Sequence, residues 1–318
     1  MSAETGLRVA AEPTLLSARR RARLTRGAAP YALLAPATIV VGAVLGYPLY
    51  LLVQLSFQKY GLPQLLTHHG EWTGLSNYTR ILHDSQFWHV LLRTVTFTAA
   101  NVSLTMLFGT LIALLLARLG SFMRLLLTTG LVLVWATPVV VSVNVWLWMV
   151  DYEFGVLNWT LTKLHAGNFV HHDWFANTLS GFGVITAVVV WGAIPFVAIT
   201  LYAALSQVPE ELHEAARIDG ASFVQVFRFV TMPLLKPIFI ILVSLSIIWD
   251  FQVFNQVWIM RDGRPTDDYY LMSIYSFVES FRISEYGLGS SIAVVMVLFM
   301  FGVTFVYIRQ MVRIGEVQ

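Results

Sequence analysis

Six long apolar stretches constrain the fold of this 318-residue chain more than any other feature of its sequence. A membrane-spanning helix needs about 20 consecutive, mostly apolar residues. Only 12% of the residues are charged, whereas soluble proteins average about a quarter. We therefore predict an all-α membrane protein with six transmembrane helices, forming a single domain over residues 30–318. The predicted spans are residues 31–56, 90–117, 125–150, 179–205, 236–259 and 288–308.

The positions of the basic residues predict the orientation in the membrane. Arginines crowd the segment before the first apolar stretch, at positions 8, 19, 20, 21, 23 and 26. Because cytoplasmic segments carry an excess of Lys and Arg, we expect both termini on the cytoplasmic side of the inner membrane. Residues 1–29 are then a basic cytoplasmic tail that contacts membrane lipid. A nucleic-acid partner is not expected from these arginines.

The segment between the fourth and fifth stretches predicts two short helices joined by a tight turn. Pro209 suits the first turn of a helix, and Glu210 meets the positive end of the helix dipole. Gly220 is free to adopt a positive φ and end that helix. Ser222, followed three residues later by Gln225, predicts a capping box for a second helix.

The second of these helices is expected to carry an apolar stripe and to end at Pro233 and Pro237. Four apolar residues recur there at i, i+3, i+4 and i+7 spacing: Phe223, Val226, Phe227 and Val230. A short cytoplasmic hairpin with an apolar face can insert into a cleft of another protein. We interpret residues 207–235 as a docking surface.

The order of residues in this hairpin resembles the signature of bacterial ABC importer permeases. The match consists of Glu-Ala-Ala, three residues, Gly, nine residues, aliphatic, one residue, aliphatic, Pro, here running from Glu214 to Pro233. The resemblance implies a coupling helix that rests in a groove of an ATPase subunit. It assigns coupling to Glu214, Ala215, Ala216, Asp219 and Gly220, with Glu214 as the anchor and Gly220 as the turn.

A second segment, Gly74-Leu75-Ser76-Asn77-Tyr78 followed by Asp84, Phe87 and Trp88, resembles the stretch that precedes the second span in sugar-type permeases. The resemblance implies three kinds of partner: a second permease of similar fold, a pair of ATPase subunits at the cytoplasmic face, and an extracytoplasmic sugar-binding protein. It also implies alternating access. The chain has no nucleotide-binding glycine loop, so we expect no cofactor in it, and ATP and Mg²⁺ to be bound by the ATPase subunits.

Polar residues within the fifth stretch indicate where cargo could bind. An ionisable residue at membrane depth is a functional candidate by default, which singles out Asp250. Ser246, Trp249, Asp250 and Val253 have helical spacing and are expected to share one face. A carboxylate beside an aromatic plane suits a sugar, which offers hydroxyl groups and apolar C–H faces. Trp191 and Phe196 on the fourth stretch are further candidates for lining the pocket, although they are equally typical of helix packing.

Other functions remain open from the sequence alone. A membrane-embedded sugar-transferring enzyme would also use aromatic residues and a carboxylate, and an ABC permease for a non-sugar solute would share the hairpin. A passive channel is disfavoured because no charged ring or filter-like loop is evident. The paired histidines at 68–69 and 171–172 do not have convincing metal-ligand spacing, so no metal site is predicted. Chitobiose, cellobiose, trehalose, maltose-like sugars and glycerol phosphate diesters all remain possible cargoes.

Overall fold

The computed structural model describes residue 31 and residues 33–315. The predicted basic tail, residues 1–29, lies outside the described residues. The chain divides into two compact units, one up to Gln54 and one from Leu55 onward. The residues of the first unit that the structure describes form an apolar helix that belongs to the candidate span Leu33–Ser56. This helix contains a π-helical turn, η1 (Gly42–Gly46), directly before α2 (Tyr47–Ser56).

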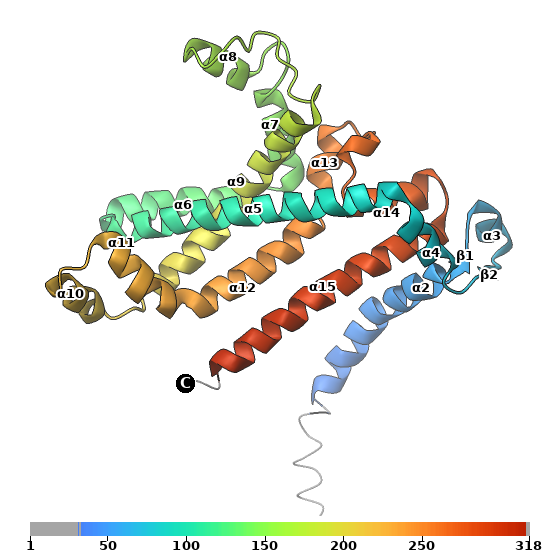
Figure 1. The fold of residues 1–318 in the computed structure, drawn as a ribbon, viewed down its shortest axis with the longest axis horizontal. Helices are drawn as coiled ribbons and strands as arrows, with labels where there is room; N and C mark the ends of the chain where they lie inside the picture. Colours follow the sequence, from blue (N-terminus) through green and yellow to red (C-terminus); the bar gives the residue numbers. More distant parts are fainter. Residues whose placement is uncertain (1–30, 32, 316–318) are drawn as a thin grey trace, which may run out of the picture. The chain divides into compact units, whose positions relative to one another are not determined.

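The second unit is almost entirely helical (Figure 1). Its one sheet among the described residues is a two-stranded antiparallel ribbon, β1 (Gln58–Lys59) with β2 (Glu71–Trp72). The long helices are α5 (Ser85–Arg118), α9 (Thr178–Leu205), α12 (Met232–Phe251) and α15 (Tyr286–Gly315). The shorter helices are α3 (Leu62–Thr67), α4 (Ser76–His83), α6 (Ser121–Ala136), α7 (Val139–Met149), α8 (Val156–Lys163), α10 (Glu210–Ile218), α11 (Phe223–Val226), η2 (Phe227–Thr231), α13 (Asn255–Met260), η3 (Asp267–Tyr269), α14 (Met272–Phe277) and η4 (Val278–Arg282).

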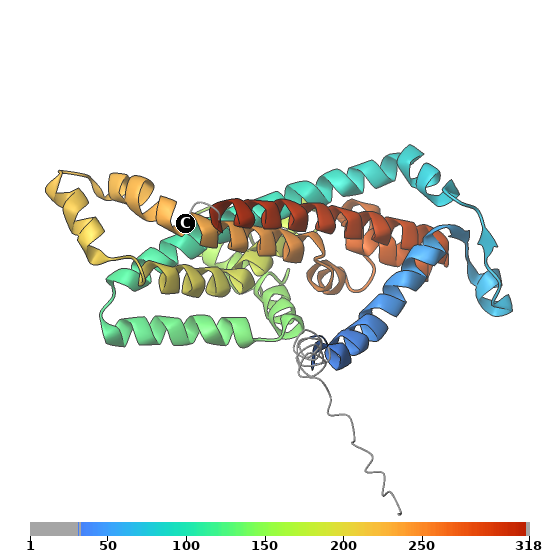
Figure 2. The ribbon, with the colours of Figure 1, turned by 90° about the horizontal axis from the view of Figure 1, so that it is seen from below.

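Helix α5 is the central element of the second unit. It packs along α9 and against α12, and α12 also contacts α9 and α15. Figures 1 and 2 both show the hairpin of α10 and α11 at one end of these long helices and α4 and α14 at the other. Two of the long helices begin at a residue whose side chain caps the helix. Asp84 Oδ1 accepts a hydrogen bond from Gln86 N (2.9 Å) before α5, and Asn177 Oδ1 accepts one from Leu179 N (2.8 Å) before α9.

The predicted membrane spans are present among the described residues, and one of them is sharply bent. In the part of the chain that the structure describes, five helices are long and apolar enough to cross a membrane: Leu33–Ser56, Ser85–Arg118, Thr178–Leu205, Phe223–Phe251 and Tyr286–Val312. The third predicted span, residues 125–150, is divided into α6 and α7, which are bent by 101° relative to each other. The break falls at Thr137 and Pro138, because proline lacks an N–H and disfavours helical geometry in the residue before it.

The fifth span begins earlier and ends earlier than the predicted range of 236–259. We expected Pro233 and Pro237 to end the second hairpin helix, but α11 instead continues through the π-helical turn η2 into α12. Pro233 lies in the first turn of α12, where its missing N–H costs little, and Pro237 is tolerated inside the helix. At the other end, α12 stops at Phe251 and a short break precedes α13.

Candidate functional site

A cavity of about 270 Å³ lies between the third, fourth and fifth spans. Helix α9 contributes Trp191 and Phe196 to its lining, and α12 contributes Trp249 and Asp250. Trp135, near the end of α6, completes this set of aromatic and acidic side chains. The volume is close to the lower end of the roughly 300–1,000 Å³ of ligand pockets, which are mostly apolar with a few placed polar groups.

Three aromatic rings follow one another along the cavity wall. Phe196 contacts Trp135 on one side in a stacked arrangement, with ring centroids 6.4 Å apart. On its other side it meets the edge of Trp249 at 5.2 Å. Trp249 and Trp135 are 46% and 60% exposed, so their faces are available to a ligand. Trp191 makes a further edge contact with Trp146 of α7 at 6.2 Å.

Asp250 is the one carboxylate in the cavity lining, and it is only 4% exposed. Its Oδ2 atom has no hydrogen-bond partner among the described residues. Burying a carboxylate oxygen without a hydrogen-bond partner costs free energy, because the oxygen loses its hydrogen bonds to water and gains none in the protein. Asp250 therefore brings an unsatisfied hydrogen-bond acceptor to the wall of the cavity.

The structure brings most of the residues predicted for this site to one cavity. Trp191, Phe196, Trp249 and Asp250 come together as expected, whereas Ser246 is buried but lies outside the cavity lining. Val253 does line the cavity, although it follows the end of α12. Its position is set by the chain break after Phe251, so helical spacing is not what brings it there.

Sequence reasoning missed other lining residues because they belong to the bent third span or follow the break after α12. These include Trp135, Ser142 and Gln256. The dipeptide Thr137-Pro138 was the available signal, since a proline inside an apolar run marks a helix boundary or a kink. A kink there brings residues from both sides of the break toward one cavity.

The hairpin at the other end of the long helices adopts the predicted local structure. Pro209 caps α10, and Gly220 has φ +79° in the turn. Both hydrogen bonds of the capping box are present: Ser222 N donates to Gln225 Oε1 (2.7 Å), and Gln225 N donates to Ser222 Oγ (3.4 Å). These features are confirmed because each depends on only a few neighbouring residues.

One side-chain contact joins the hairpin to α5, and another joins its two arms. The Arg118 guanidinium, at the end of α5, lies 4.2 Å from the centroid of the Phe223 ring. A hydrogen bond of 3.2 Å joins His213 Nε2 on α10 to Thr231 Oγ1 in η2, within the hairpin. The bond between its two arms suits a segment that moves as one body.

The outer face of the hairpin is open to solvent. Glu214, Ala215, Asp219 and Gly220 are exposed, and Ala216 is half-buried. Glu214 and Asp219 form no ion pair with any described residue. Ile218, which sequence reasoning did not single out, is 85% exposed. An exposed aliphatic side chain between free carboxylates is typical of a surface that another protein covers.

The histidines at 171 and 172 pack against aromatic rings. His171 lies 5.2 Å from the ring of Tyr152, and His172 lies 4.9 Å from the ring of Trp174. Within residues 33–315, no group of three or more histidines, aspartates or glutamates is arranged to hold a metal ion. These histidines therefore serve the packing of the loop around α8.

The fold and the hairpin define a membrane subunit of a transport system. Residues 106–314 match the family model of the binding-protein-dependent transport system inner membrane component. This chain belongs to that family. It is therefore a multi-span permease of the inner membrane, a transport component and not an enzyme.

Curated relatives cover about three quarters or more of the chain. The chain is 43% identical, over 94% of its length and 91% of the relative, to the diacetylchitobiose uptake system permease protein DasB of Streptomyces coelicolor. It is 33% identical, over 74% of its length and 78% of the relative, to the trehalose/maltose transport system permease protein MalF of Thermococcus litoralis.

A solved structure supports the fold independently. It is the crystal structure of a bacterial ABC transporter involved in the import of the acidic polysaccharide alginate. The likeness has a TM-score of 0.75 at 19% identity and covers 92% of this chain and 99% of the other. At that identity it establishes the shared fold alone.

Proposed function

We propose that this chain is one of two permease subunits of an ATP-driven importer that carries a di- or oligosaccharide across the cytoplasmic membrane. The observation that carries the proposal is the meeting of Trp249 and Asp250 in one cavity, with an unpartnered carboxylate oxygen beside an exposed aromatic face. Sugar hydroxyl groups donate to carboxylates, and the C–H faces of sugar rings pack on aromatic rings. The names of the curated relatives support the same substrate class.

The first sugar to test is N,N′-diacetylchitobiose, because the relative with 43% identity is named for its uptake. The cavity in this chain is small for a disaccharide. A second permease facing it would enlarge and complete it, as expected where a substrate site lies between two similar halves near the bilayer midplane.

The remaining partners follow from the proposed assembly. An extracytoplasmic binding protein delivers the sugar, and a pair of ATPase subunits binds ATP and Mg²⁺ at the cytoplasmic face. The hairpin docks on an ATPase subunit through Glu214, Ala215, Ala216, Asp219 and Gly220. Both termini and the hairpin are cytoplasmic in this arrangement, in agreement with the positions of the basic residues.

The connections between the hairpin and the long helices α5 and α12 explain alternating access. When the ATPase subunits close on ATP, they displace the hairpin as a rigid lever. The contact between Arg118 and Phe223 transmits that displacement to α5, and the continuous helix from α11 through η2 transmits it to α12. Since Asp250 lies near the far end of α12, movement of this helix alters the side from which the cavity is reached.

Co-purification tests the proposed assembly. A tagged chain is extracted from native membranes in mild detergent, and the proteins recovered with it are identified by mass spectrometry. We expect a second permease of similar length and an ATPase with a nucleotide-binding loop. A lone chain that is stable without an ATPase would overturn the importer and favour a membrane-embedded sugar-transferring enzyme.

A further inference from the structure

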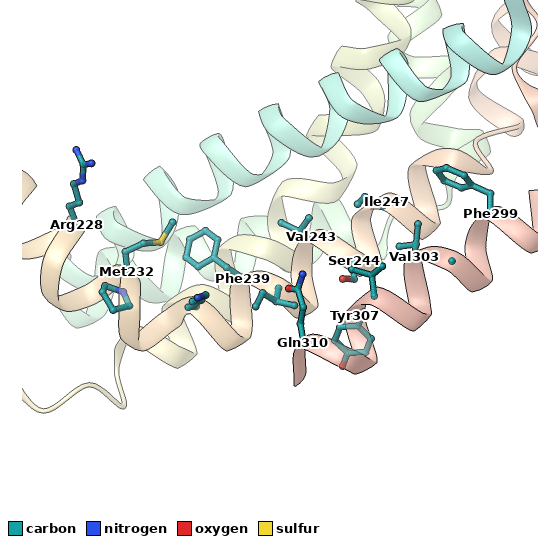
Figure 3. A pocket seen from close by; sticks show the side chains of 15 residues that line it. Arg228, Met232, Phe239, Val243, Ser244, Ile247, Phe299, Val303, Tyr307 and Gln310 are labelled. Atoms are coloured by element: carbon teal, nitrogen blue, oxygen red, sulfur yellow. The ribbon is translucent and has the colours of Figure 1, made fainter. Parts of the chain in front are cut away.

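A second, larger cavity lies along α12 between Met232 and Ile247, nearer the start of this helix than the functional site. It is a groove of about 1030 Å³ between α12 and α15 (Figure 3). Its middle part is apolar: α12 contributes Phe239, Val243 and Ile247, and α15 contributes Phe299 and Val303. None of the aromatic or acidic residues of the sugar cavity takes part in its lining.

The end of the groove nearest the hairpin is basic. Arg228 and Lys236 both line it there, and Figure 3 shows Arg228 at the opposite end from Phe299. Both side chains are exposed, and neither has a carboxylate within ion-pair distance among the described residues. Tyr307 and Gln310 of α15 add a hydroxyl and an amide to the lining. The groove therefore joins two uncompensated cations and hydrogen-bonding groups to a long apolar wall.

The order of basic and apolar groups along the groove matches an anionic phospholipid, which has a charged headgroup and apolar acyl chains. A headgroup phosphate accepts hydrogen bonds from Arg and Lys, and acyl chains pack on aliphatic and aromatic side chains. Basic pockets between transmembrane helices on the cytoplasmic side are known to hold anionic lipid headgroups. An apolar helix of another protein would fit the middle of the groove but would leave the two cations without a counter-charge.

We propose that the groove between α12 and α15 binds one anionic phospholipid, with its phosphate at Arg228 and Lys236 and its acyl chains along Val243, Ile247 and Val303. Placing this lipid in the inner leaflet rests on the cytoplasmic orientation of the hairpin proposed above. A lipid seated here contacts the turns of α12 that precede Trp249 and Asp250. The lipid composition of the membrane thereby affects the helix that carries Asp250.

Substitution of Gly302 can fill the apolar part of the groove and leave Arg228 and Lys236 unchanged. It lines the groove on α15, and a Cβ atom added to it would meet nothing within 4 Å. A leucine at this position therefore enters open space and occupies the volume assigned to acyl chains. Gly183 on α9 offers a matched control, because it also has nothing within 4 Å and lies outside the groove.

Native mass spectrometry of the full chain in detergent tests this site directly. Phosphatidylglycerol and phosphatidylcholine are titrated separately into wild type, Lys236→Gln, the double variant Arg228→Gln/Lys236→Gln, and Gly302→Leu. Arg309→Gln and Gly183→Leu serve as controls, since Arg309 is an exposed cation of α15 that does not line the groove. The assay uses no sugar and no ATP, so its outcome is independent of whether the chain transports a saccharide.

We expect one phosphatidylglycerol to bind wild type and both controls more tightly than phosphatidylcholine. Its affinity should fall about fivefold in Lys236→Gln and about 25-fold in the double variant, because each basic residue near an anionic headgroup contributes a factor of about five. Gly302→Leu should weaken both lipids. Equal binding of the two lipids by wild type would overturn the proposal, as would unchanged binding in the double variant or loss in the controls to the same extent.

Discussion

The guanidinium of Arg118 lies over the ring of Phe223, 4.2 Å from its centroid, and joins the end of α5 to the start of α11. The hairpin therefore contacts the central helix of the second unit as well as the helix into which it continues. Such a cation–π contact is worth about 0.5–2 kcal/mol. Its two partners belong to segments more than a hundred residues apart in the sequence, so the contact could not be read from local pattern.

Removing this contact should weaken the link between ATP hydrolysis and transport. In the assembled transporter, Phe223→Leu is expected to lower the sugar moved per ATP hydrolysed by about two- to tenfold, while the complex still assembles. Phe122→Leu is the matched control, because Phe122 is an aromatic residue of α6 that is 72% exposed and makes no cation–π contact among the described residues. Equal loss in both variants would show that the Arg118 contact has no special role.

The positive φ of Gly220 makes the hairpin turn sensitive to substitution. A β-branched residue at φ +79° is strained by about 1–3 kcal/mol, so Gly220→Val should distort the docking face and abolish most uptake while the chain still inserts into the membrane. Gly220→Asn should retain much more activity, since asparagine tolerates this conformation. Uptake and membrane insertion are measured together. Normal uptake by Gly220→Val would remove this turn from the coupling surface.

Substitution of Glu214 tests the charge of the same docking face, whereas substitution of Gly220 tests its backbone conformation. Because it is exposed and forms no ion pair with a described residue, Glu214→Ala should leave the stability of the isolated chain within about 0.5 kcal/mol of wild type. Co-purification of the ATPase should nevertheless fall. Glu153→Ala, in an exposed external turn, provides the control. Retention of the ATPase by Glu214→Ala would contradict its role as the anchor.

Glu279 should make stability depend on pH. Burial, and then the nearby Glu285 carboxylate, raise the pKa of Glu279 from about 4.5 to about 7 in the folded protein. The protonated form is therefore favoured by folding, and the resulting stability is complete below pH 4.5 and is lost as the pH rises through 7. Thermal unfolding at pH 5 to 8 should show Glu279→Gln gaining stability relative to wild type as the pH increases. A difference that does not vary with pH would contradict this account.

How much of this protein could be predicted depends on the range of the interactions involved. Membrane spans and the hairpin follow from runs of apolar residues and from caps such as Ser222 with Gln225, which act over a few positions. The carboxylate at Asp250 was equally visible, since an acid inside an apolar run stands out.

Three other features depend on tertiary structure and were missed. The 101° bend between α6 and α7 brings Trp135 to the cavity, and a π-helical turn carries the chain past Pro233 without a stop. The break after Phe251 sets the position of Val253. In each case neighbouring helices stabilise a local geometry that the residues alone do not require.

Uptake by cavity variants tests the central claim most directly. The transporter recovered with this chain is reconstituted in proteoliposomes with its binding protein, and ATP-dependent entry of labelled N,N′-diacetylchitobiose is measured. Trp249→Ala should lower uptake about tenfold through loss of an aromatic contact, and Asp250→Asn about 10- to 100-fold through loss of charge-assisted hydrogen bonds. Binding-protein affinity and ATPase assembly should be unchanged. Wild-type uptake in both variants would contradict a sugar site at Trp249 and Asp250.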